Sequence, residues 1–343
     1  MDKRGFKTKT IVKNIQEKIN DWLPTIKDDA LRARVKDDYI LTGGAIASML
    51  VGDLPNDYDL YFKTPEVARD LANYYIKPLI DTSNPKISKI EAQIIGPNQV
   101  GSGRVRIMLK SVGVYQDGDN VDDYAYFEGE PLESLDGYLK KNALKRDARK
   151  KYNVFGVTSN AITLYEGIQI ITRFTGSPED IHKNYDFVHC TNYYTERTGL
   201  VLNQPALEAI LAQELKYIGS VYPIASMFRL RKFIKRGWSV TVGEMLKIAW
   251  DINKLRLDDP EVLEEQLVGV DYAYFREVID ILRKEGYDVT KPIDRTYLFE
   301  TINRVFDEAD EENTALVDRH ITYQDRSHSE MVDFGVRQIS SSM

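Results

Sequence analysis

Two aspartates separated by one residue, Asp57 and Asp59, are the side chains of this sequence best suited to chemistry. They accompany the apolar run Tyr58–Phe62, which predicts a β-strand. Because side chains alternate along a strand, both carboxylates are expected on one face and Tyr58 on the other. Two carboxylates held this close repel each other, and a divalent cation relieves that repulsion. The pair therefore predicts a metal site.

A pair of glycines, Gly43 and Gly44, precedes the aspartates. They follow an apolar run over 39–41 that predicts a buried strand, and they come just before a short helix predicted over 45–51. Without a Cβ, their backbone N–H groups can approach phosphate oxygens, and a helix N-terminus favours negative charge. We therefore expect a triphosphate to bind here, with an added hydroxyl from Ser48 one turn into the helix.

The two motifs together predict phosphoryl-transfer chemistry. Two Mg²⁺ ions, with Mn²⁺ as an alternative, would lie roughly 3.5–4 Å apart and stabilise the attacking and leaving oxygens of an in-line displacement. The expected reaction moves a nucleotidyl group from an NTP to a hydroxyl and releases pyrophosphate. Either motif alone is more typical of an ordinary turn or of solvated acids, so it is their order and spacing that favour a site.

The segment 41–62 resembles the head domain of the DNA polymerase β-like nucleotidyltransferase superfamily, nearest to the bacterial poly(A) polymerases and CCA-adding enzymes. Their motif, GG-x-V-R-D-x-L-L-G-x-x-P-x-D-x-D, aligns without gaps, and similar sequences in large phage genomes suggest a phage-encoded member. The Arg-Asp pair of that motif falls on Ala47 and Ser48 here, which speaks against CCA addition itself. The matching positions are Gly43, Gly44, Leu50, Gly52, Pro55, Asp57 and Asp59.

The resemblance implies a third carboxylate on a neighbouring strand, and Asp186 is the best candidate. It lies in the apolar segment 185–190, which predicts a strand, and an acid there is unlikely to be left unpaired. In that role Asp186 would bind the catalytic metal with the other two aspartates and help to deprotonate the attacking hydroxyl. A surface acid at a strand start is the alternative. Glu166 and Asp180, both in turn-like contexts, are weaker candidates.

Basic side chains are expected to bind the nucleotide. Arg173, at the end of a strand predicted over 168–174, is expected to contact a phosphate. The segment 223–240 resembles the arginine-rich neck helix of the same enzymes. This implies that its basic residues approach nucleotide or nucleic acid, namely Arg229, Arg231, Lys232, Lys235 and Arg236. An ordinary amphipathic helix with a solvated basic face is the alternative. The basic run 140–151 is expected to be solvated or neutralised by the acidic stretch before it.

The elements around these motifs predict an α+β fold, with a nucleotidyltransferase-type mixed β-sheet domain and helices, followed by a mostly α-helical C-terminal domain. A hairpin is predicted over 86–115, and strands 160–164 and 168–174 are joined at Glu166-Gly167. Helical periodicity marks 205–218, 223–236, 242–255, 260–268 and 271–285. The expected organisation is a helical segment 1–34, a catalytic domain 35–191 with an insertion at about 82–150, a helical domain 192–306 and an acidic, polar tail 307–343.

Composition limits the classes of partner. A net charge of −7 argues against a broad basic surface that wraps nucleic acid, but it allows a local basic groove. Cys190 is the single cysteine, no apolar run approaches the roughly 20 residues that span a bilayer, and the N-terminus lacks the apolar stretch of a secretory signal. We expect a cytoplasmic protein, in the host cytoplasm for a phage protein, with no membrane partner.

The expected ligand is an NTP, and the candidate acceptors are an RNA 3′ end, a tRNA, a protein or a small molecule. A catalytically silent protein of the same fold, acting through interactions or associated with a virion, is the alternative. The sequence does not indicate an oligomeric state.

Overall fold

The computed structural model describes residues 5–79, 90–95, 104–109, 151–157 and 160–257, together with residues 262 and 266. The chain as far as Asp251 forms one compact unit, and the remainder forms a second. Most of the insertion expected at about 82–150, most of the helix predicted over 260–268, the helix predicted over 271–285 and the tail 307–343 lie outside the described residues.

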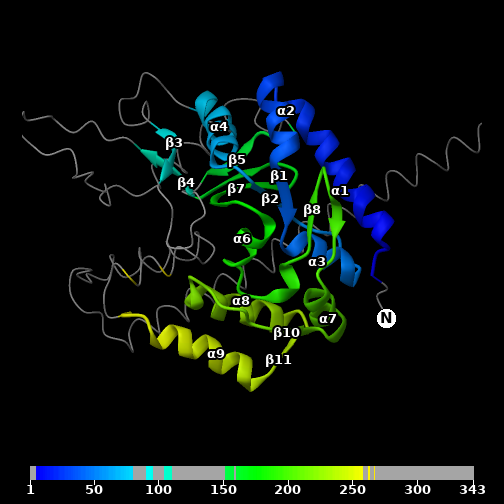
Figure 1. Ribbon diagram of the computed structural model, residues 1–343, viewed down its shortest axis with the longest axis vertical. Helices are drawn as coiled ribbons and strands as arrows, with labels where there is room; N and C mark the ends of the chain where they lie inside the picture. Colours follow the sequence, from blue (N-terminus) through cyan, green and yellow to red (C-terminus); the bar gives the residue numbers. More distant parts are fainter. Residues whose placement is uncertain are drawn as a thin grey trace, which may run out of the picture. The chain divides into compact units, whose positions relative to one another are not determined.

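A seven-stranded mixed sheet organises this unit, with the strand order β5-β6-β7-β2-β1-β8-β9 (Figure 1). β2 and β7 pair in parallel, and the other neighbouring strands pair antiparallel. The strands predicted over 39–41, 58–62, 160–164 and 168–174 are confirmed. The sheet consists of β1 (Tyr39–Thr42), β2 (Tyr58–Phe62), β5 (Val154–Val157), β6 (Ala161–Leu164), β7 (Ile168–Thr175), β8 (Tyr193–Thr195) and β9 (Gly199–Val201).

Helices pack an apolar core against one face of this sheet. Alternate residues of β2, namely Tyr58, Leu60 and Phe62, belong to this core together with Ile168 and Ile170 of β7. The intervening residues of both strands must therefore point to the opposite face. The contributing helices are α1 (Thr8–Trp22), α2 (Asp29–Asp38), α3 (Gly44–Val51) and α4 (Pro65–Ile76), with the 3₁₀ turns η1 (Leu23–Thr25) and η2 (Lys77–Leu79) after α1 and α4.

The predicted hairpin is present as the antiparallel pair β3 (Ile90–Ile95) and β4 (Arg104–Leu109). Asn73 of α4 fastens it, because its side-chain amide donates to the carbonyl of Ala92 and its side-chain oxygen accepts from the Ala92 N–H. The hairpin therefore rests on the helix that covers the core.

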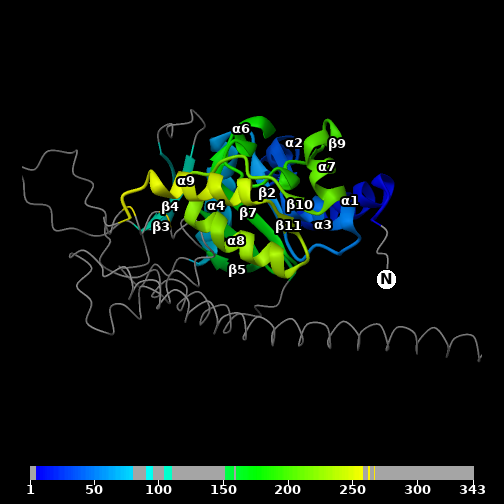
Figure 2. The same ribbon diagram turned by 90° about the horizontal axis from the view of Figure 1, so that it is seen from below.

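The sheet continues past residue 191 through β8 and β9, and helices follow it. These are α7 (Gln204–Ala212), α8 (Pro223–Lys235) and α9 (Val242–Asn253), and α8 and α9 lie side by side in both views (Figures 1 and 2). The helix predicted over 205–218 ends at Ala212, because Gln213 is left-handed and β10 (Glu214–Leu215) pairs with β11 (Ser239–Val240). The α+β class with a mixed sheet followed by helices is confirmed.

The strand predicted over 185–190 is wrong. A short helix, α6 (Pro178–His182), precedes this segment, and only Phe187 forms an isolated bridge, to Tyr217. The chain then turns into the 3₁₀ helix η3 (Val188–Cys190). Phe187, Val188 and His189 are consecutive and all buried. A short run of buried residues has the same sequence pattern whether it forms a strand or a turn of helix, so periodicity cannot distinguish the two.

None of the helices in the described part of the chain combines the length and the apolar character that crossing a membrane requires.

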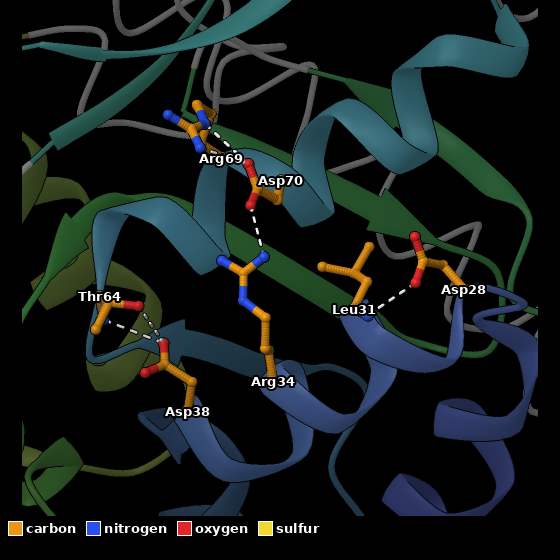
Figure 3. Close-up of polar contacts among 7 residues, drawn as sticks. All are labelled: Asp28, Leu31, Arg34, Asp38, Thr64, Arg69 and Asp70. Atoms are coloured by element: carbon orange, nitrogen blue, oxygen red, sulfur yellow. Dashed lines mark hydrogen bonds and ion pairs between the residues drawn. The ribbon is translucent and has the colours of Figure 1, made fainter.

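Polar contacts join the end of α2 to the start of α4 (Figure 3). The buried carboxylate of Asp38 accepts hydrogen bonds from the backbone N–H of Thr64, at 3.1 Å, and from its hydroxyl, at 3.2 Å. Thr64 is the N-cap residue of α4 and precedes Pro65, but its own side chain makes no capping hydrogen bond. Its N–H donates instead to Asp38 of α2. Arg34 and Asp70 form a more exposed pair at 2.8 Å between the same helices.

Replacing Asp38 by alanine should destabilise the fold by about 1–2 kcal/mol, because it removes two partners from the start of α4 at a buried position. Urea denaturation followed by circular dichroism measures this. Asp70→Asn, which breaks the exposed pair, should change the unfolding free energy by less than about 1 kcal/mol. Equal effects of the two substitutions would contradict the assignment.

Candidate functional site

The glycine pair lies where β1 ends and α3 begins, directly beside Asp59. Gly43 has φ +99°, and a Cβ placed on it would lie 3.0 Å from Oδ2 of Asp59. Its N–H donates to the carbonyl of Cys190 at 3.2 Å, and the preceding Thr42 hydroxyl donates to the carbonyl of Asn192 at 2.8 Å. Only glycine meets both the backbone and the steric requirement at position 43.

Gly44 has a different environment from Gly43. It is exposed, and a Cβ added there would meet no atom within 4 Å. As the first residue of α3, it leaves the helix N-terminus open to solvent beside the Asp59 carboxylate. Ser48, one turn along the helix, is partly exposed. The predicted triphosphate-binding site at the start of α3 is therefore accessible.

Asp57 and Asp59 lie on the face of β2 opposite the apolar core, as their alternation with Tyr58 and Leu60 predicts. Asp57 immediately precedes β2 and is exposed, whereas Asp59 is partly buried. The loop before β2 is tightly held, since a Cβ on Gly167 would lie 2.3 Å from the carbonyl oxygen of Asn56.

The electrostatic environment of Asp59 favours a bound cation. Burial, and next the negative charge of Asp57, raise the pKa of Asp59 from its ordinary 3.8 to about 7. The positive charges of Arg229 and Lys232 act in the opposite direction. Asp59 is therefore an acid whose charge is poorly compensated, and this is the condition that a divalent cation relieves.

Asp186 forms an ion pair with an arginine. Its Oδ2 accepts a hydrogen bond from Nη1 of Arg229 at 2.7 Å, and its side chain is only 12% exposed. Over the residues that the structure describes, no group of three His, Cys, Asp or Glu side chains is arranged to hold a metal ion. The three aspartates predicted to share two ions are thus not brought together as such a group.

The two remaining carboxylates still fit a metal. Mg²⁺ is commonly held by one or two carboxylates together with substrate phosphates and water, and Asp57 with Asp59 supplies such a pair beside the exposed N-terminus of α3. The residues present therefore fit one divalent cation better than a site with three protein carboxylates.

Among the predicted arginines, Arg229 lies close enough to Asp59 for its positive charge to lower the pKa of that acid. Arg231, two residues further along α8, lies about 200° around the helix axis from it. Arg173 stacks on Tyr222, just before α8, with its guanidinium carbon 3.8 Å from the ring centroid. We interpret this contact as a connection between β7 and α8.

Three further residues of this region were not predicted from the sequence: Tyr61, Gln169 and Tyr185. Tyr61 shares the face of Asp59 on β2, and Gln169 lies beside Asp59 in the register with β7. The hydroxyl oxygen of Tyr185 would lie 3.5 Å from a Cβ on Gly43, and its ring contacts Tyr61. The two-residue alternation along β2 could have predicted Tyr61. Nothing in the sequence indicates that Gln169 pairs with Asp59 or that Tyr185 lies beside Gly43.

The two glycines should respond differently to alanine. Gly43→Ala should destabilise the fold by about 1–3 kcal/mol, since it forces a left-handed alanine against Asp59. Gly44→Ala should leave the unfolding free energy nearly unchanged and weaken the binding of tripolyphosphate. Urea denaturation and calorimetric titration measure the two effects, and a well-folded Gly43→Ala protein would refute the steric argument.

Removing the charge of Asp59 should stabilise the metal-free protein above pH 7. Because its folded pKa lies near 7 and its unfolded pKa near 3.8, the folded state holds an extra proton between these values. Stability is therefore lost as pH rises through this window.

Asp59→Asn should abolish that loss. At pH 8 it should raise the free energy of unfolding by about 1–2 kcal/mol over wild type, a value reduced for partial solvent screening. Urea denaturation in EDTA at pH 5 and pH 8 tests this, with Asp57→Asn expected to give a smaller gain. The same pH dependence in wild type and Asp59→Asn would exclude Asp59 as the titrating group.

Comparison with solved structures finds CCA-adding enzymes, the class that the sequence motif resembles. The Thermotoga maritima CCA-adding enzyme complexed with tRNA_CCA has 10% sequence identity and a TM-score of 0.35, over 79% of this chain and 54% of the enzyme. The Bacillus stearothermophilus CCA-adding enzyme in complex with CTP has 12% identity and a TM-score of 0.32, over 80% and 54%. This chain spans about half of the length of either enzyme.

Comparison with sequence families is more specific. The chain is 20% identical over 149 residues to Gabija anti-defense 2 of Bacillus phage SPbetaL7, which covers 40% of this chain and 37% of the relative. It thus spans well under half of that relative's length. The family described as Gabija anti-defense 2 family protein matches residues 13–213, which is more than half of the chain and includes the glycine pair and all three aspartates. The chain belongs to the Gabija anti-defense 2 family.

Proposed function

We propose that this protein is a nucleotidyltransferase that moves a nucleotidyl group from an NTP to an acceptor hydroxyl in a Mg²⁺-dependent reaction. One observation carries the proposal: the Gly43 backbone lies against the Asp59 carboxylate at the open N-terminus of α3. That arrangement puts donors for phosphate oxygens beside an acid that favours a cation. Asp57 adds a second carboxylate on the same face of β2.

The roles in this proposal divide between three elements. Asp57 and Asp59 of the β2 region would hold the metal ion, which when bound supplies charge neutralisation of the phosphates. Gly44 and the N-terminus of α3 receive phosphate oxygens through backbone N–H groups, with Ser48 one turn away. From α8, Arg229 offsets the negative charge of Asp59 and would attract the triphosphate.

The acceptor belongs to the same proposal and remains one of four classes: an RNA 3′ end, a tRNA, a protein or a small molecule. Gabija anti-defense 2, the phage relative, is named for action against a defence. We therefore propose that this protein also acts against that defence, in the cytoplasm of a phage host, and that the transfer reaction modifies a component of it or of the host.

A second candidate is a protein that binds nucleotide without transferring it. The observation in its favour is the Asp186–Arg229 ion pair, which leaves the described residues without a three-carboxylate group. Such a protein would act through interaction, and the same experiment separates the two candidates.

The test is incubation of the protein with each of the four α-³²P-labelled NTPs, Mg²⁺ or Mn²⁺, and either total cellular RNA or a host protein extract. We expect label in one acceptor class and release of pyrophosphate. Asp57→Asn and Asp59→Asn should each reduce labelling by at least about 100-fold, because each removes a proposed metal ligand. Asp70→Asn, remote from the site, should retain wild-type labelling.

Equal labelling by wild type and Asp57→Asn would refute the proposed chemistry. Nucleotide binding without label transfer, measured by calorimetry, would favour the second candidate. The biological part is tested by plating phage on bacteria that carry Gabija and express the chain, where we expect restored plating. If Asp57→Asn and Asp59→Asn restore plating equally well, the action does not depend on the transferase site.

A further inference from the structure

The carboxylate of Asp186 and the guanidinium of Arg229 join the segment after α6 to the middle of α8. Their Oδ2 and Nη1 atoms lie 2.7 Å apart, and the side chains are 12% and 45% exposed. A charge-assisted bond of this length is among the stronger polar contacts in proteins. It therefore fixes the direction of the Arg229 side chain, which is long and would otherwise be mobile.

The backbone around Asp186 is itself held in place. Its carbonyl accepts a hydrogen bond from the N–H of Ile218 at 2.9 Å, and the N–H of Val188 donates to the carbonyl of Lys216 at 3.0 Å. Between these bonds, Phe187 is 1% exposed and stacks edge-on with Tyr217. Asp186 thus projects from a rigid support.

Packing also fixes α8 at two points. Arg173 of β7 stacks on Tyr222, immediately before the helix. One turn beyond Arg229, the ring of Phe233 packs edge-on against His189 and Phe187, with centroids 4.6 and 5.9 Å apart. These contacts hold the helix against the segment that carries Asp186.

The charges of Arg229 and Lys232 reach the candidate site. The two residues are three positions apart on α8 and so share a helix face. Both contribute positive charge at Asp59. The segment that carries Asp186 also contacts the glycine turn, because the N–H of Gly43 donates to the carbonyl of Cys190 at 3.2 Å. Arg229 is therefore within electrostatic range of Asp59 while it is bonded to Asp186. A guanidinium has five N–H donors in a planar fork, so it can serve a carboxylate and a phosphate together.

We propose that Asp186 is a positioning residue, which holds Arg229 toward the site so that Arg229 and Lys232 bind the β- and γ-phosphates of the nucleotide. The inference rests on the proposed function and assigns Asp186 a role other than that of metal ligand. A carboxylate already bonded to a guanidinium at 2.7 Å is a poor ligand for a second cation, because the arginine charge repels the metal.

Two probes distinguish positioning from metal ligation: Mn²⁺ alone, followed by electron paramagnetic resonance, and inorganic tripolyphosphate with Mg²⁺, followed by calorimetry. Asp186→Asn should weaken tripolyphosphate binding about 10-fold and leave Mn²⁺ affinity unchanged, because the neutral amide holds the guanidinium less strongly. Asp57→Asn should weaken Mn²⁺ binding. Asp70→Asn, which breaks the similar Arg34–Asp70 pair on the helices of the opposite face, is the matched control and should change neither.

A double-mutant cycle tests whether Asp186 acts through Arg229. Arg229→Gln should weaken tripolyphosphate binding more than Asp186→Asn, and the double variant should bind no worse than Arg229→Gln alone. Arg229→Lys, which keeps the charge without the planar fork, should bind tripolyphosphate with intermediate affinity and no longer respond to Asp186→Asn.

The outcomes separate this inference from the proposed function. If Asp186→Asn loses Mn²⁺ as Asp57→Asn does, Asp186 is a metal ligand and the inference is wrong. If wild type binds both probes and Asp186→Asn binds them equally well, the inference fails while the proposed site stands. If wild type binds neither probe, the proposed function and this inference are both wrong. Additive losses in the double variant would also refute a role through Arg229.

Discussion

The contact between the Gly43 backbone and the Asp59 carboxylate is the constraint on which the candidate site depends. Any side chain at position 43 would fill the space beside Oδ2 of Asp59 and would also need a left-handed backbone. The contact exists because β1 and β2 are adjacent antiparallel strands, so the turn that leaves one strand lies next to the residues that open the other. The start of α3 and the paired acids are thereby brought to one place.

The same arrangement has an electrostatic consequence. Asp59 is partly buried, beside the charge of Asp57, and the resulting rise in its pKa means that folding stabilises its neutral form near pH 7. A protein selected only for stability would remove one of these acids, because each replacement by asparagine is expected to stabilise the fold. An unfavourable pair of acids beside an accessible helix N-terminus is typical of a binding site.

Helix α8 supplies the balancing charge, and tertiary contacts determine which of its basic residues can do so. Arg229 and Lys232 share one helix face, which the aromatic contacts of Phe233 direct toward the segment of Asp186. Arg231 belongs to the other side of the helix. The match to the Gabija anti-defense 2 family covers residues 13–213, which include Asp186 but not α8. The pairing of Asp186 with Arg229 thus joins the family-matched region to the helix that follows it.

Local rules in the sequence determined the strands β1 and β2, the glycine turn between β1 and α3, and the shared face of Asp57 and Asp59. Each depends on residues only a few positions apart, through apolar runs, the absence of a Cβ and two-residue alternation. Only the tertiary structure decided that Asp186 pairs with Arg229, that Arg173 stacks on Tyr222 and that Gln169 lies beside Asp59. Those contacts join segments tens of residues apart, and strand register and helix packing, which select them, leave no periodic signal in the chain.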